Sequence, residues 1–289
     1  MQIASPRLFA NLALFDARLM QLRQVKIYDR TRGVKYLHER KLPPRSLRIA
    51  DQLLDSVNTY ADRGGSLTFT NRFAQGRIEC EVELAASRVA PQVTGRFSVL
   101  CDRGASQVVS LPFERGGMYS HKGMFPVDGE LAIGGERVRL DPRDTLALLD
   151  DHKGYYPYVM RWDWVTCATW VDGVALGFNL TRNQCRDPLQ YNENCAWRGD
   201  QIGVLPAIEV TRTGVGEPGE RWVFRDREGR VDVAFEPSVP GDVRVQAVIV
   251  ESRYRGPFGQ FSGRLEPAGL PPIVVDGWFG MGEDFHLRC

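Results

Sequence analysis

The stretch that decides the fold is LDDHKGYYPYVMRWDWVTCATWVDGVALGFNLTRNQCRDPLQYNEN, residues 149–194. It holds three of the six tryptophans beside acidic, amide and histidine side chains, a mixture that suits either a packed core or a ligand pocket. In Trp162-Asp163-Trp164, strand alternation predicts both indoles on one face and Asp163 on the other. The run Val171-Asp172-Gly173-Val174 places an Asp-Gly turn between two apolar segments, which predicts a β-hairpin.

The second strand of this hairpin predicts where polar side chains gather. Phe178 and Asn179 are neighbours, so Asn179 is expected on the face away from Phe178. Residues 150–157 are expected to form a loop that enters the hairpin. On one interpretation, the tryptophans floor a pocket edged by Asp150, His152, Asn179 and Glu193. On the other, the aromatic rings are core and the polar groups cap turns, which is the more frequent role of such clusters.

The rest of the chain also has the patterning of strands. In residues 78–84, four apolar side chains alternate with three glutamates, which predicts one buried face and one hydrated face. Residues 9–22 are expected to form two strands. Turn signals recur about every 8–12 residues, as in a β-barrel or sandwich. Only Asp141–Leu149 has the capping pattern of a short helix. The predicted fold class is therefore all-β and antiparallel.

Paired glycines at Gly116-Gly117 mark an expected domain boundary. The expected domains are residues 1–116 and residues 117–289, and the second carries the tryptophan-rich stretch. Met1 runs almost directly into an apolar element. We therefore expect that a first strand of the N-terminal domain lies upstream of this sequence.

Charge and composition argue against several classes of function. The chain has 37 Lys and Arg against 36 Asp and Glu, a net charge of +1, which favours neither nucleic acid nor an anionic membrane. No apolar run approaches the roughly 20 residues of a membrane span, so no stable membrane insertion is expected. Six cysteines without a C-x-x-C pair indicate free thiols in a reducing compartment. With no signal-peptide pattern, the expected location is cytoplasmic; the oligomeric state stays open.

Short motifs along the chain resemble one known family. They are Tyr119-Ser-His-Lys122, Leu149-Asp150, Gly154, Pro157-Tyr158, Trp162-Asp163-Trp164, Gly177-Phe178-Asn179-Leu180, Glu193-Asn194, Phe258-Gly-Gln-Phe-Ser-Gly263 and Asp276-Gly-Trp-Phe-Gly-Met-Gly-Glu-Asp284. Together they resemble the bacterial family catalogued as domain of unknown function 2804, over nearly the whole chain. That resemblance brings no activity to carry over.

A more distant likeness is to hydroxyneurosporene synthase, a carotenoid hydratase, and to the AttH-like proteins. Those proteins resemble two tandem lipocalin-like antiparallel β-barrels with a ligand cavity, and tocopherol cyclase and certain pericyclic cyclases have related folds. The likeness implies acid-assisted or binding-assisted chemistry on apolar, polyene-like substrates without a redox cofactor. Because fold analogy is a weak basis for function, it transfers no catalytic residue.

Two functions therefore stay open, with a purely structural or partner-binding β-protein behind them. The first is a hydratase, isomerase or cyclase that acts on an apolar or lipid-like small molecule. A carboxylic acid in an apolar cavity has a raised pKa and can act as a general acid, and Asp150 and Glu193 are the candidates. The second is a lipocalin-like carrier that uses the same pocket without chemistry.

The remaining candidate residues would bind the ligand. Trp162 and Trp164 would line the cavity and stabilise a developing cation over their rings. Three side chains would orient substrate or water: Tyr156, Asn179 and Asn194. His121 and His152 are also placed among the ligand-binding residues; a two-histidine metal site lacks a spaced third ligand, so neither a metal site nor a cofactor is expected.

The end of the chain offers two further candidate acids. Residues 273–279 are expected to form a final strand. Gly280 and Gly282 would permit a turn that brings Glu283 and Asp284 together at one end of the second barrel. Two adjacent carboxylates near an apolar pocket would interact, so that one could keep its proton to higher pH. The alternative is that both pair with arginine or cap a turn.

Overall fold

The computed structural model describes residues 1–18, 20–246 and 251–288. Within them every element is a strand apart from two three-residue 3-10 turns, and no helix is long and apolar enough to cross a membrane. The first elements are β1 Gln2–Ala4, β2 Leu8–Asp16, β3 Gln21–Asp29, β4 Val34–Leu42, β5 Ser56–Asp62, β6 Gly65–Arg72, η1 Phe73–Gln75, β7 Arg77–Leu84, β8 Val93–Leu100, η2 Cys101–Arg103, β9 Ala105–Pro112, β10 Gly117–Ile133, β11 Glu136–Leu140 and β12 Leu146–Tyr155. The others are β13 Val159–Val171, β14 Val174–Arg182, β15 Cys195–Arg198, β16 Gln201–Val204, β17 Glu209–Thr213, β18 Arg221–Arg225, β19 Val231–Val239, β20 Asp242–Gln246, β21 Glu251–Arg255, β22 Phe258–Leu265 and β23 Ile273–Arg288.

The chain forms two compact units, each built on a curled antiparallel sheet of lipocalin-like form. Unit 1 comprises Met1–Gly104 and Met124–Leu148, and unit 2 comprises Ala105–Gly123 and Leu149–Cys289. Strands β10 and β12 therefore each contribute residues to both units. The expected division into domains 1–116 and 117–289 stays a prediction; residues 116 and 117 both lie within a unit 2 segment.

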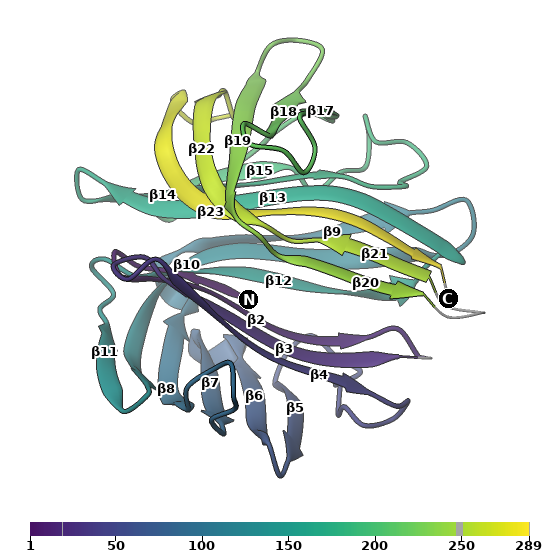
Figure 1. The fold of residues 1–289 in the computed structure, drawn as a ribbon. Helices are drawn as coiled ribbons and strands as arrows, with labels where there is room; N and C mark the ends of the chain where they lie inside the picture. Colours follow the sequence, from purple (N-terminus) through teal and green to yellow (C-terminus); the bar gives the residue numbers. More distant parts are fainter. Residues whose placement is uncertain (19, 247–250, 289) are drawn as a thin grey trace. The chain divides into compact units, whose positions relative to one another are not determined.

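Unit 1 shows how simple alternation builds the sheet. Strand β7 pairs with β6 and β8, and its four apolar side chains are all buried between glutamates that are half-buried or exposed. Because side chains alternate across a strand, the glutamates form the hydrated face, as predicted. The segment of residues 9–22 contributes to two paired strands, β2 and β3, which lie side by side in Figure 1. That prediction is also confirmed.

Unit 2 is organised by the predicted hairpin. Strands β13 and β14 pair from Asp163 opposite Arg182 to Val171 opposite Val174. The two turn residues have positive φ, 49° at Asp172 and 76° at Gly173, as a two-residue hairpin turn requires. The sheet continues in the order β16-β15-β14-β13-β23-β22-β19-β18-β17. Figure 1 shows these strands curving together as one sheet.

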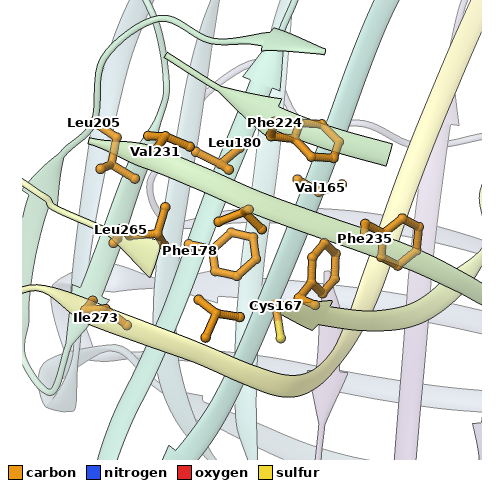
Figure 2. Packing of buried hydrophobic residues seen from close by; sticks show 14 of the residues in the cluster. Val165, Cys167, Phe178, Leu180, Leu205, Phe224, Val231, Phe235, Leu265 and Ile273 are labelled. Atoms are coloured by element: carbon orange, nitrogen blue, oxygen red, sulfur yellow. The ribbon is translucent and has the colours of Figure 1, made fainter. Parts of the chain in front are cut away.

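One face of this curled sheet encloses the apolar core of unit 2 (Figure 2). Its aromatic rings pack closely, with Phe235 stacked on Phe261 at 4.5 Å between ring centres. The cluster includes Val165, Cys167, Leu176, Phe178, Leu180, Leu205, Trp222, Phe224, Val231, Val233, Phe235, Phe261, Leu265, Ile273, Val275 and Trp278. Phe178 is fully buried here, and its neighbour Asn179 lies on the opposite face, as predicted.

Two local predictions before the hairpin are wrong. Asp141–Leu149 is not a helix: the Thr145 amide donates to the Asp141 carbonyl in a turn, and strand β12 follows. Residues 150–155 are not a loop, because β12 continues through them to Tyr155. The start of β12 pairs with β1, far away in sequence, so tertiary pairing overrides the local capping signal.

The expected turn near the C-terminus is also wrong, because β23 runs unbroken from Ile273 to Arg288. The glycines there permit close packing. A Cβ on Gly280 would lie 2.3 Å from the Thr166 carbonyl oxygen, and one on Gly282 would lie 2.9 Å from the Trp222 ring. Side chains at both positions would clash with neighbouring strands. Close packing therefore accounts for both glycines, and no turn is needed.

Adjacent valines on β23 provide a matched test of this core. Val275 is 2% exposed and belongs to the core, whereas Val274 is 67% exposed. Val275→Ala should lower the free energy of unfolding by about 2 kcal/mol, because it leaves a cavity in a packed core. Val274→Ala should lower it by less than about 1 kcal/mol. Urea denaturation of both variants measures the difference, and equal losses would contradict the placement of the core.

Candidate functional site

A cavity lies within unit 2, on the face of the sheet opposite the apolar core. The space that the centres of water-sized spheres can occupy in it is about 60 Å³, enough for water or a small ligand group. Its lining includes Phe113, Met118, Lys122, Asp150, His152, Tyr156, Met160, Arg161, Trp162, Trp164, Thr181, Glu193 and Glu283. The cavity therefore combines aromatic walls with several charged groups.

The two tryptophans of β13 form one wall of this cavity. Trp162 and Trp164 both line it, so their predicted common face is confirmed. Trp164 is buried, whereas Trp162 is only half-buried. Asp163 lies on the other face, where it pairs with Arg182 at 2.8 Å and Arg212 at 2.5 Å. Alternation thus separates the pocket indoles from a structural ion-pair network.

Asn179 holds the buried tryptophan in position. The Trp164 indole N–H donates to Asn179 Oδ1 at 2.6 Å, and Asn179 Nδ2 donates to the Glu193 backbone oxygen at 3.0 Å. A buried indole N–H needs such a partner. Asn179 therefore lies behind the wall and positions Trp164.

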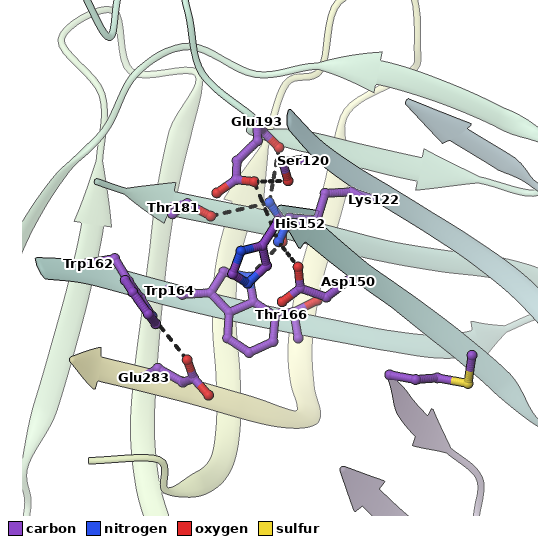
Figure 3. Close-up of polar contacts among 12 residues, drawn as sticks. Ser120, Lys122, Asp150, His152, Trp162, Trp164, Thr166, Thr181, Glu193 and Glu283 are labelled. Atoms are coloured by element: carbon purple, nitrogen blue, oxygen red, sulfur yellow. Dashed lines mark hydrogen bonds and ion pairs between the residues drawn. The ribbon is translucent and has the colours of Figure 1, made fainter. Parts of the chain in front are cut away.

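A buried lysine that was not among the predicted site residues forms the centre of the site (Figure 3). The Lys122 side chain, on β10, is 4% exposed. Its ammonium lies 2.5 Å from Asp150 Oδ1 and 3.5 Å from Glu193 Oε2, and 5.4 Å from the centre of the Trp164 ring. The Ser120 hydroxyl, on the same face of β10, donates to Glu193. A buried cation is thus held by two carboxylates and an aromatic face.

This pairing decides the charge of Asp150. Burial alone would raise its pKa, but Lys122, with a smaller contribution from His152, outweighs burial and lowers the pKa to about 2. Burial in turn would lower the pKa of Lys122, and the charges of Asp150 and Glu193 raise it instead. The expectation that the cavity raises the pKa of Asp150 is therefore wrong. At neutral pH Asp150 is an ionised partner of Lys122 and cannot serve as a general acid.

A second polar pair, Tyr156 and His152, lies beside Trp162. The Tyr156 hydroxyl and His152 Nδ1 are hydrogen-bonded, and the His152 ring meets Trp162 edge-on at 6.4 Å between centres. Burial, followed by the nearby charges of Asp150 and Glu193, raises the pKa of Tyr156. Tyr156 therefore keeps its proton and can share it with His152.

Glu283 and Asp284 lie on opposite faces of β23, so the expectation that they meet is wrong. Glu283 lines the cavity, where it accepts hydrogen bonds from the Trp162 indole at 3.1 Å and the Tyr254 hydroxyl at 2.7 Å. Asp284 is opposite Asp163 in the strand register, with Arg212 4.0 Å away. Only Glu283 approaches the tryptophans, because a continuous strand sends neighbouring side chains to opposite faces.

Two other candidate residues lie outside the cavity lining. His121 is next to Lys122 in β10 and faces the other way, and burial followed by the charge of Lys122 lowers its pKa to about 4. Asn194 accepts from the Thr181 amide at 2.6 Å and donates to the Pro206 carbonyl at 2.8 Å. Asn194 is therefore held by backbone groups of two neighbouring segments, and the proposed ligand-binding roles of His121 and Asn194 stay predictions.

Replacing the buried lysine tests the charge cluster. Lys122→Met would leave two buried carboxylates without their cation, which should lower the free energy of unfolding by roughly 3–5 kcal/mol. Lys41→Met is the matched control: that side chain is 48% exposed, so the loss should stay within about 0.5 kcal/mol. Urea denaturation measures both values. A Lys122→Met protein as stable as the unmodified one would contradict the assignment.

The pKa of Asp150 predicts a pH dependence. Its value falls from an ordinary 3.8 to about 2 on folding, so ionised Asp150 stabilises the fold above its unfolded pKa and loses this contribution as pH falls towards its folded pKa. The stability difference between the unmodified protein and Asp150→Asn should therefore narrow by roughly 1 kcal/mol between about pH 5 and pH 3. Urea denaturation across this range measures it, and a constant difference would refute the shift.

Comparison with solved structures finds a similar fold in kievitone hydratase from Nectria haematococca. The two chains are 13% identical with a TM-score of 0.54, and the match covers 99% of this chain and 87% of that one. At this level of identity, the likeness shows a common fold. The search of curated proteins gives no match. The model of one family, described as Domain of unknown function (DUF2804), matches residues 1–289, and the chain therefore belongs to that family.

Proposed function

We propose that unit 2 binds an apolar small molecule and adds water to, or removes it from, a carbon–carbon double bond by proton transfer. The observation that carries this proposal is the buried Lys122–Asp150–Glu193 cluster beside the His152–Tyr156 pair in an aromatic cavity. Titratable groups buried together in a cavity are typical of functional sites. The name of the structural neighbour, a hydratase, supports the same reaction class.

The charges in the cavity favour a reaction in which positive charge develops. Lys122 contributes one buried positive charge, against the three carboxylates of Asp150, Glu193 and Glu283. Arg161 also lines the cavity, but its side chain is exposed and donates to His286. Negative groups and indole faces stabilise a carbocation better than an enolate.

The proposed reaction balances without an oxidant or a reductant. The Tyr156–His152 pair donates a proton to one carbon of the double bond, which leaves a cation on the other carbon beside Trp162 and Trp164. Water attacks that carbon, and its proton passes to the carboxylate of Glu193. Glu193 then releases this proton to solvent and solvent returns one to the pair, so the net change is alkene plus water to alcohol, or the reverse.

Each charged group then has a distinct role. Lys122 holds Asp150 and Glu193 in fixed positions and prevents them from repelling one another. Glu193 also accepts from Ser120, which fixes the direction of its carboxylate. Glu193 accepts the proton of the attacking water, while the Tyr156–His152 pair supplies the proton to the double bond. This division differs from the sequence-based expectation, in which Asp150 and Glu193 both act as acids.

A non-catalytic carrier is the second candidate function. One observation favours it: these charged groups already have partners, because Lys122 pairs with two carboxylates and Glu283 accepts hydrogen bonds from Trp162 and Tyr254. A site with its polar groups already paired can hold an apolar ligand without reacting with it. A carrier would release its bound molecule unchanged, which separates it from the enzyme.

Labelled water tests the proposed reaction. The purified protein is incubated with an apolar metabolite extract in water labelled with heavy oxygen, and mass spectrometry searches for alcohols that gain the label. Tyr156→Phe should slow the labelling by about 100-fold or more, because it removes the donated proton. Tyr158→Phe is the matched control: Tyr158 is 63% exposed, and this variant should keep full activity.

Three outcomes distinguish the candidates. Enzyme-dependent labelling that needs Tyr156 supports the hydratase. A molecule that co-purifies in native mass spectrometry, and stays unlabelled throughout, supports the carrier and contradicts the enzyme. Labelling that proceeds at the full rate in Tyr156→Phe would show that Tyr156 takes no part in the reaction.

A further inference from the structure

The carboxylate of Glu283 is held by neutral donors, unlike four other buried or half-buried acids of unit 2 that pair with cations. Asp150 and Glu193 share Lys122, Asp163 pairs with two arginines, and Glu220 receives both guanidinium nitrogens of Arg255 at 2.7 and 2.8 Å. Glu283, in contrast, is held by Trp162 and Tyr254, which are neutral donors. Among the described residues, no cation forms an ion pair with it.

This carboxylate is fixed in place. Trp162 Nε1 binds one of its oxygens and the Tyr254 hydroxyl binds the other. Trp162 is in turn stacked on Phe285 at 3.8 Å between ring centres. Each Glu283 oxygen keeps a further lone pair, because a carboxylate can accept about four hydrogen bonds. The side chain therefore presents a preorganised negative group on the cavity wall.

We propose that Glu283 is the counter-charge for a protonated amine, so that the cavity binds aromatic organic cations in preference to neutral or anionic molecules. The inference rests on the proposed function, because that reaction develops positive charge in the same cavity. A stable ammonium ion resembles this charge, and an enzyme binds such analogues more tightly than its neutral substrate. An anion would instead meet three carboxylates and only one buried cation.

The cavity's aromatic rings suit the rest of such a ligand. Trp162, Trp164 and Tyr156 offer apolar surface, and aromatic rings beside a carboxylate are a recurring site for ammonium groups. Lys122 alone would repel a cation, but the negative charges of Asp150 and Glu193 outweigh its single positive charge. The amine is therefore expected next to Glu283 and the ring system over the indoles.

Three matched probes test the inference: naphthylmethylamine, naphthylmethanol and naphthoate, which share a ring system and differ in charge. Isothermal titration calorimetry with the full chain at neutral pH measures each affinity. We expect the amine to bind about 10-fold or more tightly than the alcohol, since a charged hydrogen bond is worth at least that factor. Naphthoate should bind most weakly. This ranking uses the unmodified protein and needs no variant.

A charge-removing variant assigns the effect to Glu283. Glu283→Gln keeps an acceptor for Trp162 or Tyr254 and should abolish the amine's advantage while leaving the alcohol's affinity within about 3-fold. Glu228→Gln, at an exposed position of the same unit, is the matched control and should preserve the advantage. Equal affinities for amine and alcohol, or an advantage that survives Glu283→Gln, would overturn the inference. If no probe binds at all, small-molecule binding itself fails and the proposed function falls with it.

Discussion

The burial of the Lys122 ammonium is the constraint on which the site depends. A lone buried charge is very unfavourable, so the fold must bring carboxylates to it. They come from separate parts of the chain: Asp150 from β12, and Glu193 from the segment just before β15. The positions of β10, β12 and the segment before β15 are therefore coupled through one ion-pair cluster. Such a cluster is weak evidence for stability, but it fixes geometry, which is what a site for proton transfer requires.

The same cluster orders the aromatic wall. Lys122 lies over the Trp164 ring, and the Trp164 indole N–H is bound by Asn179. Asn179 also binds the backbone of Glu193, whose side chain returns to Lys122. These contacts join Lys122, Trp164, Asn179 and Glu193 in one continuous network. Loss of one member leaves the others unsatisfied, so we expect mutations within the network to be non-additive.

Local pattern predicted much of the fold and part of the site. Alternation identified the β13–β14 hairpin, the common face of Trp162 and Trp164, and the opposite placements of Phe178 and Asn179. It missed Lys122, because a lysine within a strand is usually hydrated and nothing local shows that two distant carboxylates bury it. The available signal was that Ser120 and Lys122 share a face of a strand within a family motif. The pKa of Asp150 was predicted in the wrong direction for the same reason, since its direction depends on Lys122.

A one-residue shift in the register of β23 determines whether Glu283 or Asp284 faces the cavity. Before Gly277 the odd-numbered side chains Ile273 and Val275 face the core, whereas after it the even-numbered Trp278 does. The pairing with β22 shifts by one residue at this point, and Gly277 has a φ of 64°, which favours glycine. Without this bulge, alternation would carry Glu283 to the core face and Asp284 into the cavity. A single left-handed glycine, six residues before Glu283, therefore places Asp284 beside the arginine network and Glu283 in the cavity wall.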